Sequence, residues 1–321
     1  MEKQFDIAAA REVIAGIATE TPVVDSPLLT DMAGATVSLK LENLQVTGSF
    51  KVRGAACKML SLSQEDRSRG VVACSSGNHG LAVAYVAQLL GIKATVCVPE
   101  WVDPVKLEAI RSRGAETVIY GKTYDESEVR SLEIQQQQGL SYIHPFDDPH
   151  VIAGQGTIGL ELIEQVPSLG TVIVPLSGGG LVSGIALAVK SHDPSIRVVG
   201  ISAQRARVMY ESLIAGRPID FPEEETIASA LSGGIGLDNK YSFRLVRDIV
   251  DDYMLVSEEE LVEAMAFAAK EQKLVIEGGG VVGIAALLSG KVDRVAGDVA
   301  VVVSGGNVDL ATFATVIKSS L

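Results

Sequence analysis

A single lysine stands in a short stretch whose residue types are suited to covalent chemistry. The stretch "TGSFKVRGA" (residues 47–55) places Lys51 after Phe50 and after a polar, glycine-containing turn. An exposed lysine at the start of a helix explains the pattern. A lysine amine held in a tight, partly apolar turn is also the group that bonds covalently to an aldehyde. The rest of the chain has to decide between these two interpretations.

The loop "SSGNHG" (75–80) follows an expected strand and begins an expected helix. Backbone N–H groups at the start of a helix bind anions, and Ser75, Ser76 and Asn78 add side-chain donors. A serine that only caps the helix explains one of these residues but not the whole run. The loop therefore predicts a site for an anion the size of a carboxylate.

A second glycine loop, "SGGGL" (177–181), directly follows the apolar run "TVIVPL". Gly178, Gly179 and Gly180 allow the backbone to wrap around an oxyanion, with the dipole of the next helix behind them. No Walker lysine accompanies the loop, which argues against a nucleoside triphosphate. The pattern predicts a phosphate cradle.

A third loop, "SGGN" (304–307), follows the buried run "VAVVV". Ser304 would present a hydroxyl at the carboxyl end of the sheet, where open α/β sheets bind ligands. A phosphate cradle, an anion-binding loop, this hydroxyl and an isolated lysine together suit a phosphorylated aldehyde cofactor. Lys51 would be its covalent anchor.

One motif points elsewhere. The run "GQGTIG" (154–159) matches G-x-G-x-x-G, which would indicate an NAD-dependent dehydrogenase. The preceding "DDPHVIA" is a poor strand, and the next strand ends without an acidic residue for the ribose. We therefore interpret these glycines as helix–sheet packing, and the dehydrogenase remains a minor alternative.

Strands, glycine turns and helices alternate along the chain. Runs such as "TVIVP" are apolar throughout, which indicates parallel strands buried on both faces. The pattern predicts an α/β protein with two open sheets: a smaller domain over 55–145, and a larger one from 1–54 plus 146–321. The expected strands are 71–74, 93–99, 115–120, 171–176, 197–202 and 298–306, and the expected helices cover about 79–90, 103–114, 127–139, 151–166, 177–190, 257–272 and 281–290.

Composition excludes several classes of function. The chain has 321 residues, of which 47% are hydrophobic, and a net charge of -13, so no broad face neutralises nucleic-acid phosphates. Cys57, Cys74 and Cys97 form no C-x-x-C pair and suggest no disulfide framework. No signal peptide and no apolar run of about 18 residues is present. We expect a reduced, cytoplasmic protein that binds neither nucleic acid nor membrane.

Taken together, the motifs resemble the fold-type II pyridoxal-phosphate (PLP) enzymes, specifically the threonine dehydratase and serine racemase group. The resemblance runs nearly end to end, and it is closest to the hydroxyectoine-utilisation dehydratases through "GGIGLDNKYSF" and "IEGGGVVGIAALL". It implies two domains of the tryptophan-synthase-β-like kind, bound pyridoxal 5'-phosphate and a homodimer. It rests on "LKLENLQVTGSFKVRGA", "SSGNHG", "HPFDDPHVIAGQGTIGLE", "VPLSGGGL", "GIGL" and "VSGGNVDL".

The resemblance implies a role for each motif residue. Lys51 would carry the cofactor, Phe50 would pack against its ring, Asn78 would bind the ring hydroxyl and Ser304 the ring nitrogen. The phosphate would be bound by Gly178, Gly179 and Gly180, with Ser177, and the substrate carboxylate by Ser75, Ser76, Asn78 and His79.

The implied reaction is an elimination from a β-hydroxy amino acid. Once displaced by the substrate amine, Lys51 acts as the base at the α-carbon. The neutral hydroxyl of Ser304, in place of a carboxylate, favours prompt loss of the β-hydroxyl over a long-lived carbanion. The products are a 2-oxo acid and ammonia. Threonine, serine and a hydroxyectoine-derived amino acid are the candidate substrates.

Several residues depart from the family pattern. Ser177 replaces the first glycine of the usual cradle, and Gly278–Gly280 replace a proline and a small hydroxyl residue after Glu277. The glycine run is expected to change the wall beside the cofactor ring and argues against simple threonine specificity. Ser202 and Val208 stand where related racemases carry acidic cation ligands, so we expect no metal site. Arg53 is interpreted as a helix-surface residue.

Alternatives remain on the same scaffold. Ser76 matches the acid that related racemases use opposite the lysine, so a serine or aspartate racemase is the second hypothesis, with 3-hydroxyaspartate dehydration beside it. Carboxylate binding is the alternative role of Ser76. A non-enzymatic PLP- or amino-acid-binding regulator is disfavoured, because no regulatory domain follows "SGGN".

Overall fold

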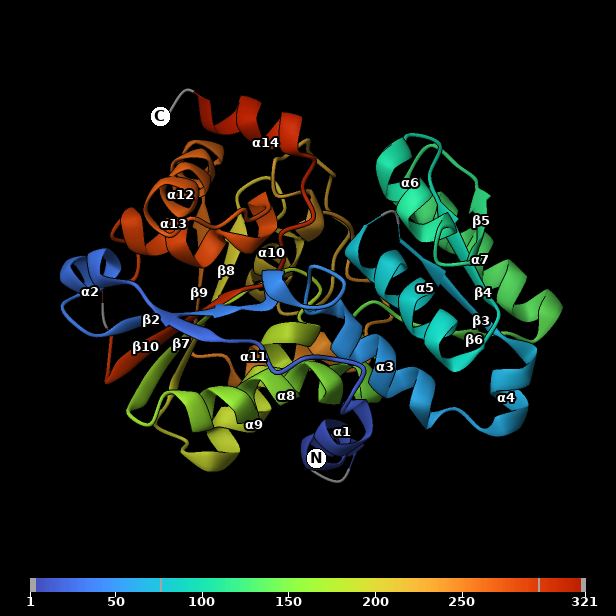
Figure 1. The fold of residues 1–321 in the computed structure, drawn as a ribbon, viewed down its shortest axis with the longest axis horizontal. Helices are drawn as coiled ribbons and strands as arrows, with labels where there is room; N and C mark the ends of the chain where they lie inside the picture. The colour runs from blue at the N-terminus through green and yellow to red at the C-terminus, as the bar shows by residue number, and fades with distance from the viewer. Residues whose placement is uncertain (1–3, 76, 294, 319–321) are drawn as a thin grey trace.

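Two open sheets organise the protein. The computed structural model describes residues 4–75, 77–293 and 295–318. A six-stranded sheet has the order β1-β2-β10-β7-β8-β9 and a four-stranded sheet the order β5-β4-β3-β6, with α3 (Lys51–Ser61) running between them (Figure 1). The strands are β1 (Val23–Asp25), β2 (Val37–Leu41), β3 (Val71–Cys74), β4 (Ala94–Val98), β5 (Glu116–Ile119), β6 (Ser141–Tyr142), β7 (Leu169–Pro175), β8 (Arg197–Ala203), β9 (Asp252–Val256) and β10 (Asp298–Val303).

The larger sheet is buried on both faces. All of its strands are parallel except β1, which pairs antiparallel with β2. Along β10, Val299, Val301 and Val303 enter one core while Ala300 and Val302 enter the other, so both sides of the strand are apolar. This confirms the prediction of parallel α/β sheets and of the α/β fold class.

Helices cover both faces of this sheet (Figure 1). One face packs on α2 (Pro27–Ala33), α12 (Glu258–Glu271), α13 (Val282–Leu288) and α14 (Leu310–Ile317). The other packs on α8 (Pro149–Gln165), α9 (Gly180–His192), α10 (Val208–Ala215) and α11 (Ser242–Ile249). In the part of the chain that the structure describes, no helix is both long and apolar enough to cross a membrane.

The smaller sheet is fully parallel. Val71 and Ala73 face a core shared with α1 (Ile7–Ile14), α3, α5 (Asn78–Leu90) and α6 (Pro104–Arg111). Val72 and Cys97 face α7 (Tyr124–Gln138) on the other side. The short α4 (Gln64–Arg69) links α3 to β3. All four strands lie within 55–145 and the other six outside it. The proposed domain boundary at 54/55 falls inside α3.

Helix ends follow local capping chemistry. The side chain of Asp103 caps α6 as expected, and Ser257 and Glu260 form a capping box at α12. Helix α7 begins at Tyr124, three residues before the expected start, because the side chain of Thr123 accepts the N–H of Glu126.

The "GQGTIG" glycines lie inside α8, not in a strand-to-helix turn. A Cβ on Gly154 would lie 2.6 Å from the carbonyl oxygen of Arg53, and one on Gly156 would lie 2.9 Å from that of Gly184. These glycines let α8 pack closely against α3 and α9. The expectation of helix–sheet packing was therefore wrong in detail: the close contacts are between helices. No phosphate-binding turn exists at this motif.

Arg53 is not a surface residue, which corrects the expectation from sequence. Its guanidinium is 1% exposed and donates to Glu42 at 2.8 and 2.9 Å and to Glu161 at 2.5 and 2.9 Å. The amine of Lys40 donates to Glu161 at 2.5 Å and to the carbonyl of Thr21 at 2.7 Å. Two buried cations thus match two buried carboxylates, and the cluster ties the first turn of α3 to β2 and α8.

We predict that Arg53→Ala destabilises the protein by about 3–5 kcal/mol, because the carboxylates of Glu42 and Glu161 stay buried without their partner. Urea unfolding monitored by circular dichroism measures the change. Arg11→Ala is the matched control, since Arg11 forms an exposed pair with Glu164 and should cost less than about 1 kcal/mol. Equal losses in the two variants would contradict a structural role for the buried cluster.

Candidate active site

The lysine turn is held by the third glycine loop. Ser49 pairs antiparallel with Gly305, the N–H of Gly306 donates to the carbonyl of Gly48 at 2.9 Å, and the N–H of Phe50 donates to that of Ser304 at 3.1 Å. These contacts join segments more than 250 residues apart. They place the start of α3, and with it the predicted reactive amine, beside the carboxyl end of β10.

The three glycine loops and the lysine meet at one cavity of about 280 Å³. Ser76 lies outside the described residues, so its predicted role stays a prediction. Every other residue predicted from sequence to act here lines the cavity: Phe50, Lys51, Ser75, Asn78, His79, Ser177, Gly178, Gly179, Gly180 and Ser304.

Lys51 is the first residue of α3 and is half-buried. Its Nζ donates to the carbonyl of Pro145 at 2.8 Å and lies 5.2 Å from the centroid of the Phe50 ring. Burial lowers the pKa of Lys51 to about 8, against the opposing effect of the Glu277 carboxylate. The uncharged fraction of the amine near neutral pH is therefore larger than that of an ordinary lysine, and the uncharged form is the one that acts as a nucleophile or general base.

The second glycine loop has the form of an anion cradle. Gly179, at φ +87°, precedes α9 and has no side chain to cap its first N–H groups. A Cβ on Gly178 would lie 2.3 Å from the Phe146 ring, and one on Gly180 would lie 2.7 Å from the carbonyl oxygen of Phe146. The hydroxyl of Ser177 donates a hydrogen bond to the backbone carbonyl of Leu231 at 2.8 Å. Backbone N–H groups are thus what this loop offers to a phosphate.

The first loop provides a second uncapped helix start. Gly77 precedes α5 without a side-chain cap, and the carbonyl of Ser75 lies 2.4 Å from where a Cβ on Gly80 would stand. His79 is buried, with Nε2 2.7 Å from the carbonyl oxygen of Ile143. Burial and the nearby Lys51 lower the pKa of His79 to about 3, so the ring is uncharged at neutral pH. The loop attracts an anion through N–H groups and not through a histidine cation.

Sequence reasoning missed Glu277 as a site residue. Its Oε1 accepts a 2.6 Å hydrogen bond from Nδ2 of Asn78, and it lines the cavity. Burial raises the pKa of Glu277, although Asn78 and two lysines oppose this. Ser304 is also buried, with its hydroxyl 3.5 Å from the carbonyl of Gly279. The only signal for Glu277 in the sequence was its position as a lone glutamate between an apolar run and a glycine run.

Sequence reasoning also missed the residues at the mouth of the cavity. Lys106 on α6 and Glu223 bring opposite charges to the lining, with Trp101, Tyr124 and residues 229–234. By contrast, Gly278–Gly280 do not appear among the described residues of the lining; a Cβ on Gly278 would lie 2.2 Å from the carbonyl of Ile227. The glycine run supports the chain behind the 229–234 loop, so its expected direct effect on the wall beside the ring is not seen.

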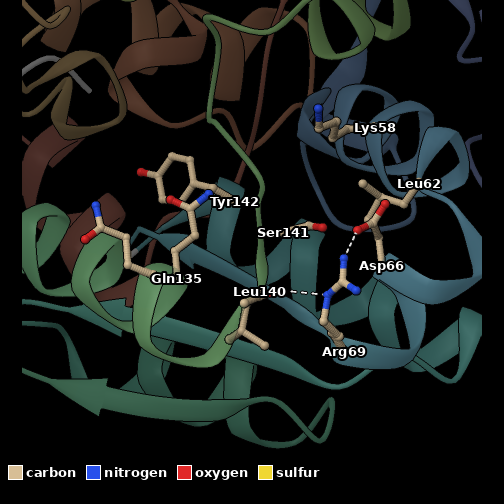
Figure 2. Close-up of a pocket in the computed structure, with 10 residues that line it drawn as sticks. Lys58, Leu62, Asp66, Arg69, Gln135, Leu140, Ser141 and Tyr142 are labelled. Carbon is tan, nitrogen blue, oxygen red and sulfur yellow. Dashed lines mark hydrogen bonds and ion pairs between the residues drawn. The ribbon is translucent and has the colours of Figure 1, made fainter.

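A second hollow of about 670 Å³ lies on the smaller unit, between α4 and the end of α7 (Figure 2). Figure 2 shows Arg69 bonded to Asp66 and to the backbone that precedes Leu140. Lys58, on the same rim, pairs with Asp148 at 2.6 Å. These charges are satisfied by each other, and the hollow brings together no nucleophile and base. It is not a candidate active site.

Comparison with known proteins agrees with this geometry. The profile of the family "Pyridoxal-phosphate dependent enzyme" matches residues 14–305. An L-threonine ammonia-lyase of Thermotoga maritima is 41% identical over 98% of this chain and 78% of its own length. A catabolic L-threonine dehydratase of Staphylococcus aureus is 40% identical over 98% of this chain and 92% of its own. The structure of maize serine racemase matches with a TM-score of 0.91 and 37% identity, covering 98% of this chain and 96% of that one.

We predict that Lys51 loses its proton at lower pH than an ordinary lysine, because burial disfavours the charged amine. Acetylation of the protein, freed of bound small molecules, by acetic anhydride at a series of pH values, read by mass spectrometry, should rise to a plateau with a midpoint near 8. The exposed Lys270 is the internal control for the reactivity of the reagent. A midpoint for Lys51 near about 10.4, the value of an ordinary lysine, would contradict the prediction.

Proposed function

Because this chain belongs to the pyridoxal-phosphate-dependent enzymes and is a carbon–nitrogen lyase of the threonine dehydratase type, we propose that it removes water and ammonia from a β-hydroxy amino acid. L-Threonine and L-serine are the first candidate substrates. Loss of water leaves an enamine, its imine form is hydrolysed by another water molecule, and the net products are a 2-oxo acid and ammonia. The observation that carries the proposal is the half-buried Lys51 amine, which faces the same cavity as the uncapped start of α9.

The residues present fit the cofactor. Gly178–Gly180, whose positions leave no room for side chains, would bind its phosphate through backbone N–H groups. Phe50 would pack on the ring, Asn78 would donate to the ring oxygen and the Ser304 hydroxyl would lie at the ring nitrogen. When bound, pyridoxal phosphate supplies an aldehyde for the amino group and a ring that withdraws electrons from the α-carbon. Lys51 would be its covalent anchor.

The remaining steps fall to the chain's own groups. The open N–H groups at the start of α5, with Ser75, would bind the substrate carboxylate and fix the amino acid. The Nζ of Lys51 would then accept the α-proton, since its lowered pKa leaves the amine ready to act as a base. The neutral Ser304 hydroxyl would limit electron withdrawal by the ring, which favours loss of the β-hydroxyl over other fates.

The identity of the substrate side chain depends on the cavity mouth. Lys106 is half-buried in the lining and would favour an acidic β-substituent such as that of 3-hydroxyaspartate. Glu223 would favour a basic one, as in a hydroxyectoine-derived amino acid. Threonine needs neither charge, and the proteins that share 40% and 41% identity with this chain are named for threonine. Threonine therefore comes first in the panel below.

A racemase is the second candidate function. The similarity to maize serine racemase covers nearly the whole chain and favours it as a candidate. Ser76 would act as the acid opposite Lys51. We also infer that the protein is a cytoplasmic homodimer. Light scattering after size-exclusion chromatography would measure the number of subunits.

We predict that the purified protein with added pyridoxal phosphate releases ammonia and 2-oxobutanoate from L-threonine. Lys51→Ala should lower the rate by about 10²- to 10⁴-fold, because the base and covalent anchor are lost. Coupled detection of ammonia measures it, with Lys270→Ala as the surface control. An unchanged rate in Lys51→Ala would refute the assignment.

A substrate panel separates the finer proposals. We expect L-threonine and L-serine to react faster than 3-hydroxyaspartate or a hydroxyectoine-derived amino acid. Lys106→Ala should selectively slow any acidic substrate, and Glu223→Ala any basic one. Chiral chromatography of serine and aspartate after incubation tests the racemase. Inversion without ammonia release would replace the dehydratase as the function.

A further inference from the structure

The side-chain amide of Asn78 is held from two sides. Its Nδ2 donates to Oε1 of Glu277 at 2.6 Å, and its Oδ1 accepts from Nδ2 of Asn307 at 2.7 Å. The same Nδ2 of Asn307 donates to the backbone carbonyl of Thr47 at 2.8 Å. Four chain segments that are distant in sequence therefore converge on one amide that lines the cavity.

The acceptors at the two ends determine which way both amides face. The carbonyl of Thr47 can only accept a hydrogen bond, so Asn307 must turn its NH₂ group toward it. Both N–H groups of Asn307 are then used, one on Thr47 and one on Asn78. Asn78 must present its oxygen to Asn307 and its own NH₂ group to the Glu277 carboxylate. One N–H of Asn78 goes to Glu277, and the second has no partner among the residues that the structure describes.

The backbone makes room for this arrangement at one glycine. Gly48 has φ +72°, and a Cβ there would lie 2.2 Å from Oδ1 of Asn307. A side chain at position 48 would therefore displace Asn307 and would also strain the turn. The glycine of "TGSFK" and the asparagine of "SGGN" are thus parts of one contact, which neither motif reveals when it is considered alone.

We propose that Asn307 is a positioning residue that orients the Asn78 amide, so that its unused N–H donates to the ring oxygen of bound pyridoxal phosphate. The inference rests on the proposed function, because it takes the cofactor role of Asn78 as its premise. Asn307 touches neither cofactor nor substrate. It acts by excluding the flipped amide, which would turn a carbonyl oxygen toward the Glu277 carboxylate and leave no donor for the ring oxygen.

The competing explanation is that Asn307 only strengthens the contact between residues 47–50 and 304–306. That role would lower stability and would affect the cofactor only through a looser site. The two explanations differ in the proton affinity of the bound cofactor. A donor to the ring oxygen stabilises its deprotonated form, so losing the donor raises the pH midpoint of the cofactor's absorption change.

The experiment compares Asn307→Ala, Asn78→Ala and the double variant with the wild-type holoenzyme. Asn307→Leu, which is similar in size but has no donor, substitutes for Asn307→Ala if the latter folds poorly. Asn43→Ala is the matched control, since Asn43 also donates from its amide to a backbone carbonyl, that of Val275, but does not contact Asn78. The readouts are the pyridoxal-phosphate dissociation constant of the apoprotein and the pH midpoint of the bound cofactor's absorption spectrum.

We expect Asn307→Ala to weaken pyridoxal-phosphate binding about tenfold and to raise the midpoint by about one pH unit, as Asn78→Ala does. The double variant should shift no further than Asn78→Ala, because Asn307 acts through Asn78. Asn43→Ala should leave both readouts at their wild-type values.

An unchanged midpoint in Asn307→Ala, or shifts that add in the double variant, would overturn the inference while leaving the dehydratase intact. A third outcome is that the wild type binds pyridoxal phosphate and consumes threonine, while Asn78→Ala shows no spectral change. That outcome would remove only the premise that Asn78 donates to the ring oxygen. Failure of the wild type to bind pyridoxal phosphate would overturn the proposed function together with the inference.

Discussion

The pairing of residues 47–50 with residues 304–306 is the contact on which the active site depends. It consists of a few backbone hydrogen bonds, yet it joins the turn before Lys51 to the loop that carries Ser304. The lysine proposed to anchor the cofactor and the serine proposed to bind its ring nitrogen are therefore positioned by one local structure. In the same first turn of α3, the buried Arg53 cluster anchors the helix to β2 and α8, so the lysine sits on a helix start that is fixed from both directions.

The electrostatic character of the cavity depends on two helices that begin beside it without a side-chain cap. A side-chain cap is worth about 1 kcal/mol to a helix, and α7, α8 and α12 have one. Helices α5 and α9 begin at glycines, and their open N–H groups face the cavity. Because no side chain caps these N–H groups, they can donate hydrogen bonds to a bound phosphate and carboxylate instead. Because burial leaves His79 uncharged near neutral pH, these helix starts, and not the histidine, add to the attraction of anions here.

Much of the fold and of the site can be predicted from the sequence, because the patterns that predict them are local. Apolar runs bounded by glycine predict buried parallel strands, and the observed β3, β7 and β10 agree with them. Each glycine loop directly follows such a strand. The loops after β7 and β10 follow neighbouring strands of one parallel sheet, so a common site for these two could be expected from the sequence. The loop after β3 belongs to the other sheet, and only the folded chain brings it to the same cavity. The family and its cofactor follow from the same motifs.

The tertiary structure decided which residues the motif residues touch. Arg53 reads as a surface residue because its partners Glu42 and Glu161 are 11 and 108 positions away, and only the folded chain buries them together. The role of Glu277 depends on Asn78, and that of Gly48 on Asn307, across longer separations in the sequence. Sequence alone determined the element types, the glycine loops and the lysine, since these depend on local backbone preferences. Burial and charge pairing arise between distant segments, so only the three-dimensional structure could assign them.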